Sequence, residues 1–293
     1  MLARADGQER DGVAIVLFLA LTILLSGIFY TLIIRAGHLS AGNRHYGEAL
    51  MWMPAIAALL TVAIRRLDIK SLGLSTFGAR YAVLGYVTPL LYAAIAYALV
   101  WTLGFGKFPD AAAIATLSAR LGWRLNAPAF VALYFLLIGS TGMIDGVARA
   151  LGEEIGWRGF LAPRLVGHMG FTWGAIVTGL IWTVWHMPVL LFADYNSGTP
   201  WWFALSCFAV MVVAISVVLT WIRLRSNSVW PCAFFHASHN LFIQAFFSPL
   251  TAAKGPWTPY VVDEFGVALP AVAIVFAILF WLYRNPKTRV PGM

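Results

Sequence analysis

Charged residues are scarce in this chain. Asp, Glu, Lys and Arg make up only 11% of its 293 residues, whereas 61% are hydrophobic, and the mean hydropathy is +0.80. A soluble protein of this length needs a charged exterior, and there is too little charge here to cover one. The composition therefore argues against a soluble enzyme. It predicts an integral membrane protein in which residues 1–293 form one domain of several helices.

Cysteine is almost absent as well. Cys207 and Cys232 lie in apolar runs, so we interpret them as small core residues rather than as a disulfide framework or a metal site. The net charge of +8 does not require nucleic acid, because membrane proteins collect Lys and Arg in cytoplasmic loops. We expect the lipid bilayer and a peptide or protein substrate as partners, and no nucleic acid. The sequence does not fix the oligomeric state.

Apolar runs of about 20 residues predict an all-α, polytopic transmembrane bundle of about eight spanning helices. The first run is too long for the hydrophobic region of an ordinary signal peptide, so we expect no cleavable one. The fourth exceeds the membrane thickness, so it should tilt or break near Gly139–Gly142. The expected spans are 13–34, 49–64, 81–103, 128–165, 171–193, 201–222, 228–247 and 266–283.

An even number of spans places both termini on one side of the membrane. Twelve Lys and Arg residues fall on the terminal side of the predicted spans and six fall on the other. Because cytoplasmic loops are enriched in positive charge, we expect a multi-pass protein of the cell membrane with both termini in the cytoplasm.

The stretch LGEEIGWRGF, residues 151–160, places three charged residues inside the fourth span. A solvated loop is the simpler interpretation, but GFLAPRL continues the apolar helix. At that depth each charge costs at least about 2.5 kcal/mol and faces the bundle interior. Glu154 and Arg158 have the i, i+4 spacing of an ion pair, whereas Glu153 is rotated about 100° away. One carboxylate is therefore neutralised, and Glu153 is free for chemistry.

Two later spans place polar residues at a similar depth, so the motif-bearing core is about 128–247. His186 lies in IWTVWHMPVLLF, and His236 and Asn240 lie in PCAFFHASHNLF. His236 and Asn240 share a helix face, and His239 could share it or point elsewhere. A lone helical histidine is more often a packed core residue than a catalyst. Three polar helix segments at one depth nevertheless favour a functional site.

These residue types suit hydrolysis of a carbonyl compound such as a peptide. A carboxylate beside an imidazole can deprotonate water, and a second histidine with an amide can stabilise an oxyanion. GxSxG is absent, and a Cys232–His236 dyad is a less favoured alternative. Glu153, His186 and His236 could instead bind Zn²⁺ with an open position. HExxH is absent, so such ligands would come from separate helices.

The three motifs resemble those of the CPBP family, the CAAX-protease and bacteriocin-processing (Abi) membrane proteins that include the Rce1 prenyl endopeptidases. The family pattern EExxxR, FxxxH and HxxxN reads EEIGWR at 153–158, WTVWH at 182–186 and HASHN at 236–240. Order and spacing match over about 150–245. Trp182 stands where the pattern has Phe. Because it is still aromatic, we expect the difference to change packing rather than chemistry.

The resemblance implies an intramembrane endopeptidase, putting Glu153 in the role of the base that activates water and His186 in that of its binding partner. His236 and Asn240 would form the oxyanion site. Glu154, next to Glu153, would form a supporting ion pair with Arg158. The family is usually described as metal-dependent, although a metal-free glutamate mechanism has also been argued, so Zn²⁺ stays an open alternative.

Two other classes of function are alternatives. The first is a catalytically silent scaffold or chaperone for secretion or immunity proteins, and the second is a transporter whose buried Glu and His relay protons or bind an ion. The intact set of acid, histidines and amide favours the endopeptidase over the scaffold. No internal repeat supports the transporter. The substrate, whether prenylated proteins, bacteriocin leaders or membrane peptides, is not chosen by the sequence.

Overall fold

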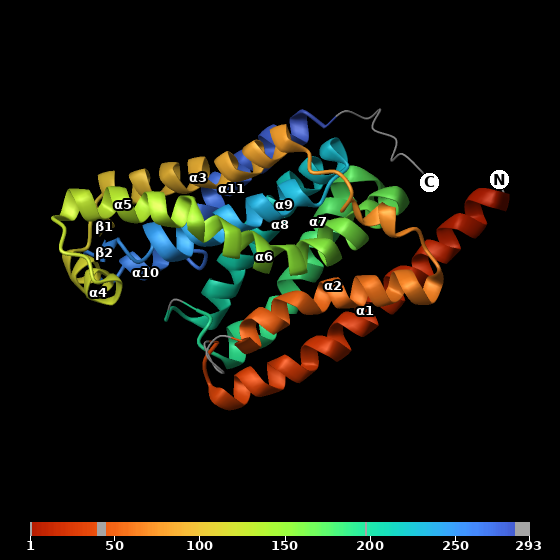
Figure 1. Ribbon diagram of the computed structural model, residues 1–293, viewed down its shortest axis with the longest axis horizontal. Coiled ribbons are helices and arrows are strands. Elements are labelled where there is room, and N and C mark those ends of the chain that lie inside the picture. The colour runs from red at the N-terminus through yellow and green to blue at the C-terminus, as the bar shows by residue number, and fades with distance from the viewer. Residues whose placement is uncertain (1, 40–44, 197, 285–293) are drawn as a thin grey trace.

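The structure, a computed structural model, describes every residue except 1, 40–44, 197 and 285–293. Its described part is almost entirely helical (Figure 1). The helices are α1 (Leu2–Ala36), α2 (His45–Arg65), α3 (Ala79–Thr102), α4 (Ala111–Leu121), α5 (Ala127–Gly139), α6 (Thr141–Glu154), α7 (Ala162–Phe192), α8 (Trp201–Ser226), α9 (Trp230–His239), α10 (Thr258–Val261) and α11 (Ala268–Leu282). The other elements are the 3-10 helix η1 (Ile69–Leu72), the π-helical segments η2 (Ile155–Leu161) and η3 (Asn240–Phe247), and the antiparallel strands β1 (Gly106–Lys107) and β2 (Ala252–Ala253).

The predicted class, an all-α polytopic bundle, is confirmed. Five helical stretches of the described chain are long and apolar enough to cross a membrane: 11–36, 45–65, 79–102, 141–192 and 201–226. The stretch 141–192 contains the second part of the fourth predicted span and the fifth span, and α5 is the first part of the fourth. The last two predicted spans correspond to α9 continued by η3 and to α11. Large apolar side chains such as Ile23, Leu24 and Val83 are exposed, as expected for a surface that faces lipid. The number of eight crossings stays a prediction.

The side of the membrane on which each terminus lies depends on the number of crossings, which stays a prediction. Three residues of the charge count, Arg44, Lys287 and Arg289, lie outside the described residues. Cytoplasmic placement of the termini therefore stays a prediction.

The fourth predicted span is broken where its glycines indicated. α5 ends at Gly139, α6 begins at Thr141, and Ser140 between them has φ −114° and ψ −81°, so the predicted break is confirmed. The chain then continues helically through η2 into α7. Gly170, with φ 76° and ψ 170°, kinks α7. Only glycine adopts that conformation without strain, and the kink separates the fourth predicted span from the fifth.

The helix with the acidic motif is wedged between α2 and α9 (Figure 1). A Cβ on Gly156 would lie 2.5 Å from Cβ of Pro54, and one on Gly152 would lie 2.7 Å from the α2 backbone. On the other side, a Cβ on Gly146 would lie 3.1 Å from Cδ1 of Leu241. These small residues let the three helices approach closely. The close packing fixes the acidic motif in the interior.

Candidate active site

The helices that carry the first and third motifs, EEIGWR and HASHN, both change from α to π winding within the motif. Glu153 and Glu154 are the last residues of α6, and η2 follows directly. His239 ends α9, and Asn240 begins η3. Single π turns inside α-helices frequently mark functional sites, because they redirect the side chains around them. The sequence patterns did not predict this winding.

Glu154 is the centre of a buried ionic cluster. Nη1 of Arg158 donates to Oε1 of Glu154 at 3.0 Å, and Nδ1 of His236 lies 2.9 Å from the same oxygen. The side chains of Glu154 and Arg158 are both 0% exposed. The ion pair that the spacing predicts is therefore present, and His236 is its third member. A buried charge is tolerated when it is paired, so Oε1 of Glu154 is occupied by these two partners.

Glu153 has a different partner, the indole of Trp182. Nε1 of Trp182 donates to Oε2 of Glu153 at 2.7 Å, and Glu153 is 2% exposed. The same indole ring lies against Arg158, whose Cζ is 4.1 Å from the ring centroid. The expectation that Trp182 changes only packing needs correction, because Phe could not donate this hydrogen bond. Trp182 links the candidate base to the Glu154 cluster.

His186 is oriented by the backbone of its own helix. Its Nδ1 lies 2.9 Å from the carbonyl oxygen of Trp182. A carbonyl oxygen only accepts, so Nδ1 carries the hydrogen, and Nε2 of the neutral ring is an acceptor. The half-buried ring packs against Trp185 and Phe208, with ring centroids 4.8 and 5.1 Å away. In this orientation His186 can accept a hydrogen bond from a water.

Residues of all three motifs lie near one another. Glu153 interacts electrostatically with both His186 and His236. The ring of Trp182 contacts both imidazoles, with centroid distances of 5.8 and 5.3 Å. Asn240 is half-buried at the start of η3, and its side chain makes no hydrogen bond to another described residue. The structure thus brings the acid and both histidines together around Trp182, whereas a role for Asn240 stays a prediction.

A zinc centre of Glu153, His186 and His236 does not follow from this geometry. Catalytic zinc sites need three protein ligands that converge on one point. Across the described ranges, no three side chains of His, Cys, Asp or Glu are grouped so that they could hold a metal ion. The residues as placed do not fit a zinc centre, so we assign no chemical step to a metal.

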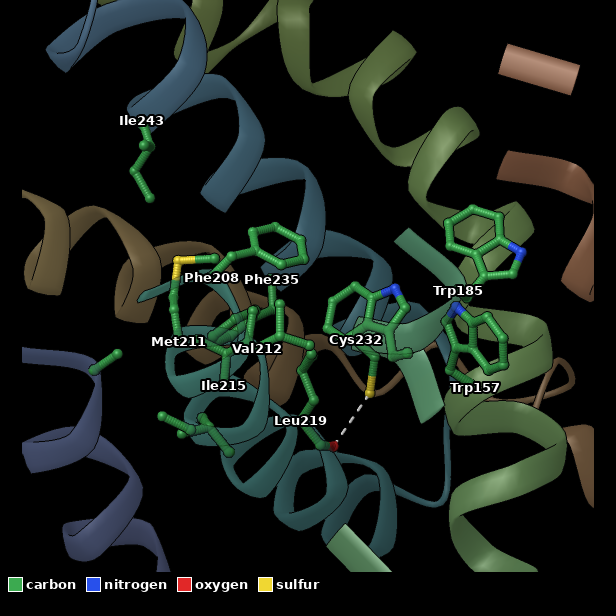
Figure 2. Packing of buried hydrophobic residues seen from close by; sticks show 14 of the residues in the cluster. Trp157, Trp185, Phe208, Met211, Val212, Ile215, Leu219, Cys232, Phe235 and Ile243 are labelled. Atoms are coloured by element: carbon green, nitrogen blue, oxygen red, sulfur yellow. Dashed lines mark hydrogen bonds between the residues drawn. The ribbon is translucent and has the colours of Figure 1, made fainter. Parts of the chain in front are cut away.

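The alternative nucleophile, Cys232, is directed elsewhere. Its Sγ lies 3.5 Å from the carbonyl oxygen of Leu219 on α8 (Figure 2). The ring of His236, its possible partner, has Nδ1 bound to Glu154. Cys232 and Cys207 are both buried and free of disulfides. The cysteines therefore occupy core positions, as the sequence indicated, and the geometry does not favour a Cys–His dyad.

Sequence reasoning missed a supporting arginine, Arg223 of α8. Its Nε donates to the carbonyl oxygen of Arg158 at 3.1 Å, and its Nη2 donates to that of Ser71 at 2.7 Å. Leu72 also packs against η2, where its carbonyl oxygen lies 3.1 Å from the Cβ position of Gly159. Arg223 thereby ties the loop at 70–75 to the π turn after the acidic motif. A basic residue at the end of a span ordinarily indicates a solvated loop, so the position of Arg223 in the sequence did not indicate this supporting role.

Sequence reasoning also missed the partners of His239. Its Nε2 lies 2.8 Å from Oε1 of Glu264, and its Nδ1 is hydrogen-bonded to the hydroxyl of Tyr92. Glu264 lies outside the three motifs, and the only signal in the sequence was an acidic residue just before the last apolar run.

Two comparisons with known proteins find similar proteins. Residues 128–242 match the model of the family described as type II CAAX prenyl endopeptidase Rce1-like, and this range contains all three motifs. A CAAX prenyl protease 2 of Methanococcus maripaludis is 26% identical in an alignment of 119 residues that covers 38% of this chain and 40% of that protein. The chain thus aligns with less than half the length of this relative. Both matches support the resemblance that the motifs indicated.

Proposed function

We propose that this chain is an intramembrane endopeptidase of the CPBP family, because residues 128–242 match the Rce1-like family model and contain all three motifs. Its substrates are membrane-associated or prenylated proteins. The observation that carries this proposal is the different binding of two adjacent buried carboxylates. Glu154 is bound by Arg158 and His236, whereas Glu153 accepts from an uncharged indole at Oε2. A buried carboxylate without a cation in contact is suited to take a proton from water.

In the proposed reaction, Glu153 removes a proton from a water that His186 orients through Nε2. The resulting hydroxide attacks the carbonyl carbon of the scissile peptide bond and forms a tetrahedral oxyanion. His236, as the imidazolium whose Nδ1–H donates to Glu154, donates to the oxyanion from Nε2, and Asn240 donates from its amide. Collapse of the intermediate breaks the C–N bond. Glu153 then gives its proton to the leaving amine and returns to the carboxylate.

Cleavage of peptides by the purified protein tests this proposal. In lipid nanodiscs, the wild type should hydrolyse a membrane-anchored peptide, and Glu153→Ala should not, with both proteins folded. Glu48→Ala is the matched control, because Glu48 is a partly exposed carboxylate whose ion-pair partners, His45 and Arg149, are not motif residues. Presenting one peptide with and without a prenyl group tests whether the substrate must be prenylated.

The same variants separate the alternatives. A scaffold would bind its partner protein without cleavage by any variant. A transporter would show proton or ion flux in vesicles that Glu153→Ala abolishes, again without cleavage. Elemental analysis of the purified wild type tests for Zn²⁺. Stoichiometric zinc that is lost in His186→Ala would mean that the side chains rearrange around a metal.

A further inference from the structure

A second buried carboxylate, Glu264, lies between α10 and α11, outside the matched range 128–242. It is 2% exposed. Its two oxygens accept hydrogen bonds from three side chains: Nε2 of His239 at 2.8 Å, Nε2 of Gln244 at 3.0 and 3.1 Å, and the hydroxyl of Tyr195 at 2.9 Å. A buried acid is expensive unless it is fully hydrogen-bonded, and this one joins three separate parts of the chain.

The backbone around Glu264 is also anchored. The N–H of Glu264 donates to Oδ1 of Asp263 at 2.6 Å, and the N–H of Asp263 donates to the hydroxyl of Tyr97 at 3.2 Å. Burial acts to raise the pKa of Glu264, but the hydrogen bonds from His239 and its other donors outweigh it and lower that pKa. Glu264 is therefore a fixed, ionised acceptor at neutral pH.

On one side, Glu264 reaches the candidate site through Tyr195. The hydroxyl of Tyr195 is bound to Glu264, and its ring stacks on His186 with a centroid distance of 6.2 Å and an interplanar angle of 30°. The next residue, Phe265, packs against Tyr195 at 5.2 Å and stacks on Phe208 at 5.7 Å. Tyr195 and Phe208 are thus two aromatic walls of His186, and the segment that carries Glu264 holds both.

On the other side, Glu264 reaches the candidate oxyanion residues through His239. This histidine lies three residues after His236 and immediately before Asn240, where α9 changes to η3. Both of its ring nitrogens have partners, Glu264 at Nε2 and Tyr92 at Nδ1. The imidazole cannot rotate without losing one of them. The contact with Glu264 therefore fixes the helix junction that carries His236 and Asn240.

We propose that Glu264 is a positioning residue of the proposed hydrolysis, which keeps Tyr195 against His186 and the α9–η3 junction in place at the same time. The proposal rests on the endopeptidase function of Glu153. In this arrangement the water-orienting histidine and the oxyanion donors are set relative to each other by one carboxylate that touches neither. Its loss should affect the chemical step more than substrate binding, because small displacements of reacting groups lower turnover steeply.

Steady-state cleavage of the membrane-anchored peptide tests this role, with kcat and KM measured per folded protein. Glu264→Gln and Tyr195→Phe should each lower kcat about ten- to hundredfold and leave KM within about threefold. The double variant should have the same kcat as Glu264→Gln, because Tyr195→Phe removes a connection that Glu264→Gln already removes. Tyr81→Phe is the control, since its hydroxyl is bonded to the neighbouring exposed Arg80 at the start of α3, and it should cleave like the wild type.

The outcomes distinguish this proposal from the function on which it rests. Active wild type with inactive Glu153→Gln, but with kcat unchanged in Tyr195→Phe and Glu264→Gln, overturns the positioning role alone. Additive losses in the double variant overturn it too. If Glu264→Gln fails to fold, Tyr195→Phe must still lower kcat by itself for the proposal to stand. Wild type that cleaves nothing overturns both proposals.

Discussion

The two buried carboxylates Glu154 and Glu264 are held in opposite ways. Glu154 is bound by an arginine four residues away on the same helical stretch, and by His236. Glu264 is bound by three side chains that lie 20 to 69 residues away, none of them Arg or Lys. The first cluster supplies a permanent cation, and the second supplies a set of polar donors. We infer that Glu154 mainly stabilises the fold, whereas Glu264 mainly sets the relative positions of the residues around the candidate site.

The largest effect on stability should come from removing the permanent cation. Arg158→Leu leaves the ionised Glu154, at 0% exposure, with only the imidazole of His236 as a partner, so we expect a loss of about 3–5 kcal/mol in the free energy of unfolding. Gln244→Leu removes only a neutral donor to Glu264 and should cost about 1–3 kcal/mol. Chemical unfolding in detergent micelles measures both. Equal losses would contradict the contrast between the two clusters.

The next effect concerns the link between the candidate base and the Glu154 cluster. Trp182→Phe restores the aromatic residue of the family pattern but removes the hydrogen bond to Glu153. A hydrogen bond to a charged group is worth about 1.5–3 kcal/mol, so kcat should fall about ten- to hundredfold while the protein stays folded. Trp281→Phe is the control, since its indole donates to Thr172 instead. Wild-type turnover by Trp182→Phe would return this position to a packing role.

The smallest effect should be a pH-dependent gain at Asp263. Burial, assisted by the charge of Glu264, raises the pKa of Asp263 to about 7. When the pKa of an acid is higher in the folded state than in the unfolded state, the acid stabilises the fold fully only below its ordinary pKa. For Asp263, this contribution to the free energy of unfolding is lost as the pH rises towards 7. Asp263→Asn removes this loss, keeps an acceptor for the N–H of Glu264, and suits the φ of 69° at this position.

Thermal unfolding of the wild type and Asp263→Asn at pH 5 and pH 8 measures that gain. The gain in stability of the variant over the wild type should be about 1–3 kcal/mol larger at pH 8 than at pH 5. The same difference at both pH values would mean that Asp263 does not titrate between them.

Features set by one helix or one apolar run could be predicted from the sequence. The bundle follows from hydropathy, the break at Ser140 follows from the glycines around it, and the pair of Glu154 with Arg158 follows from i, i+4 spacing. Each is a local property, because the residues that decide it lie within a few helical turns. Local patterns also located the segment that carries His186.

Features that depend on how distant segments meet could not be predicted. Glu264 is one acidic residue before an apolar run, and nothing in that stretch indicates that it returns to His239. The sequence shows that Trp182 is aromatic, but it does not show which group accepts the hydrogen bond of its indole N–H. The inward direction of Arg223 depends on carbonyl oxygens that the π turn and the loop at 70–75 present to it. Such contacts are decided by tertiary packing, which spacing alone does not encode.

We propose that Glu153 performs the chemistry and that Glu154 holds the structure. Peptide cleavage and thermal unfolding, measured together for Glu153→Gln and Glu154→Gln, test this division of roles directly. Glu153→Gln should unfold near the wild-type temperature, bind the peptide and not turn it over. Glu154→Gln should unfold at a lower temperature, with activity reduced in step with folded protein, because Arg158 loses its partner. Normal cleavage by Glu153→Gln, with a well-folded but inactive Glu154→Gln, would contradict the account and reverse the two roles.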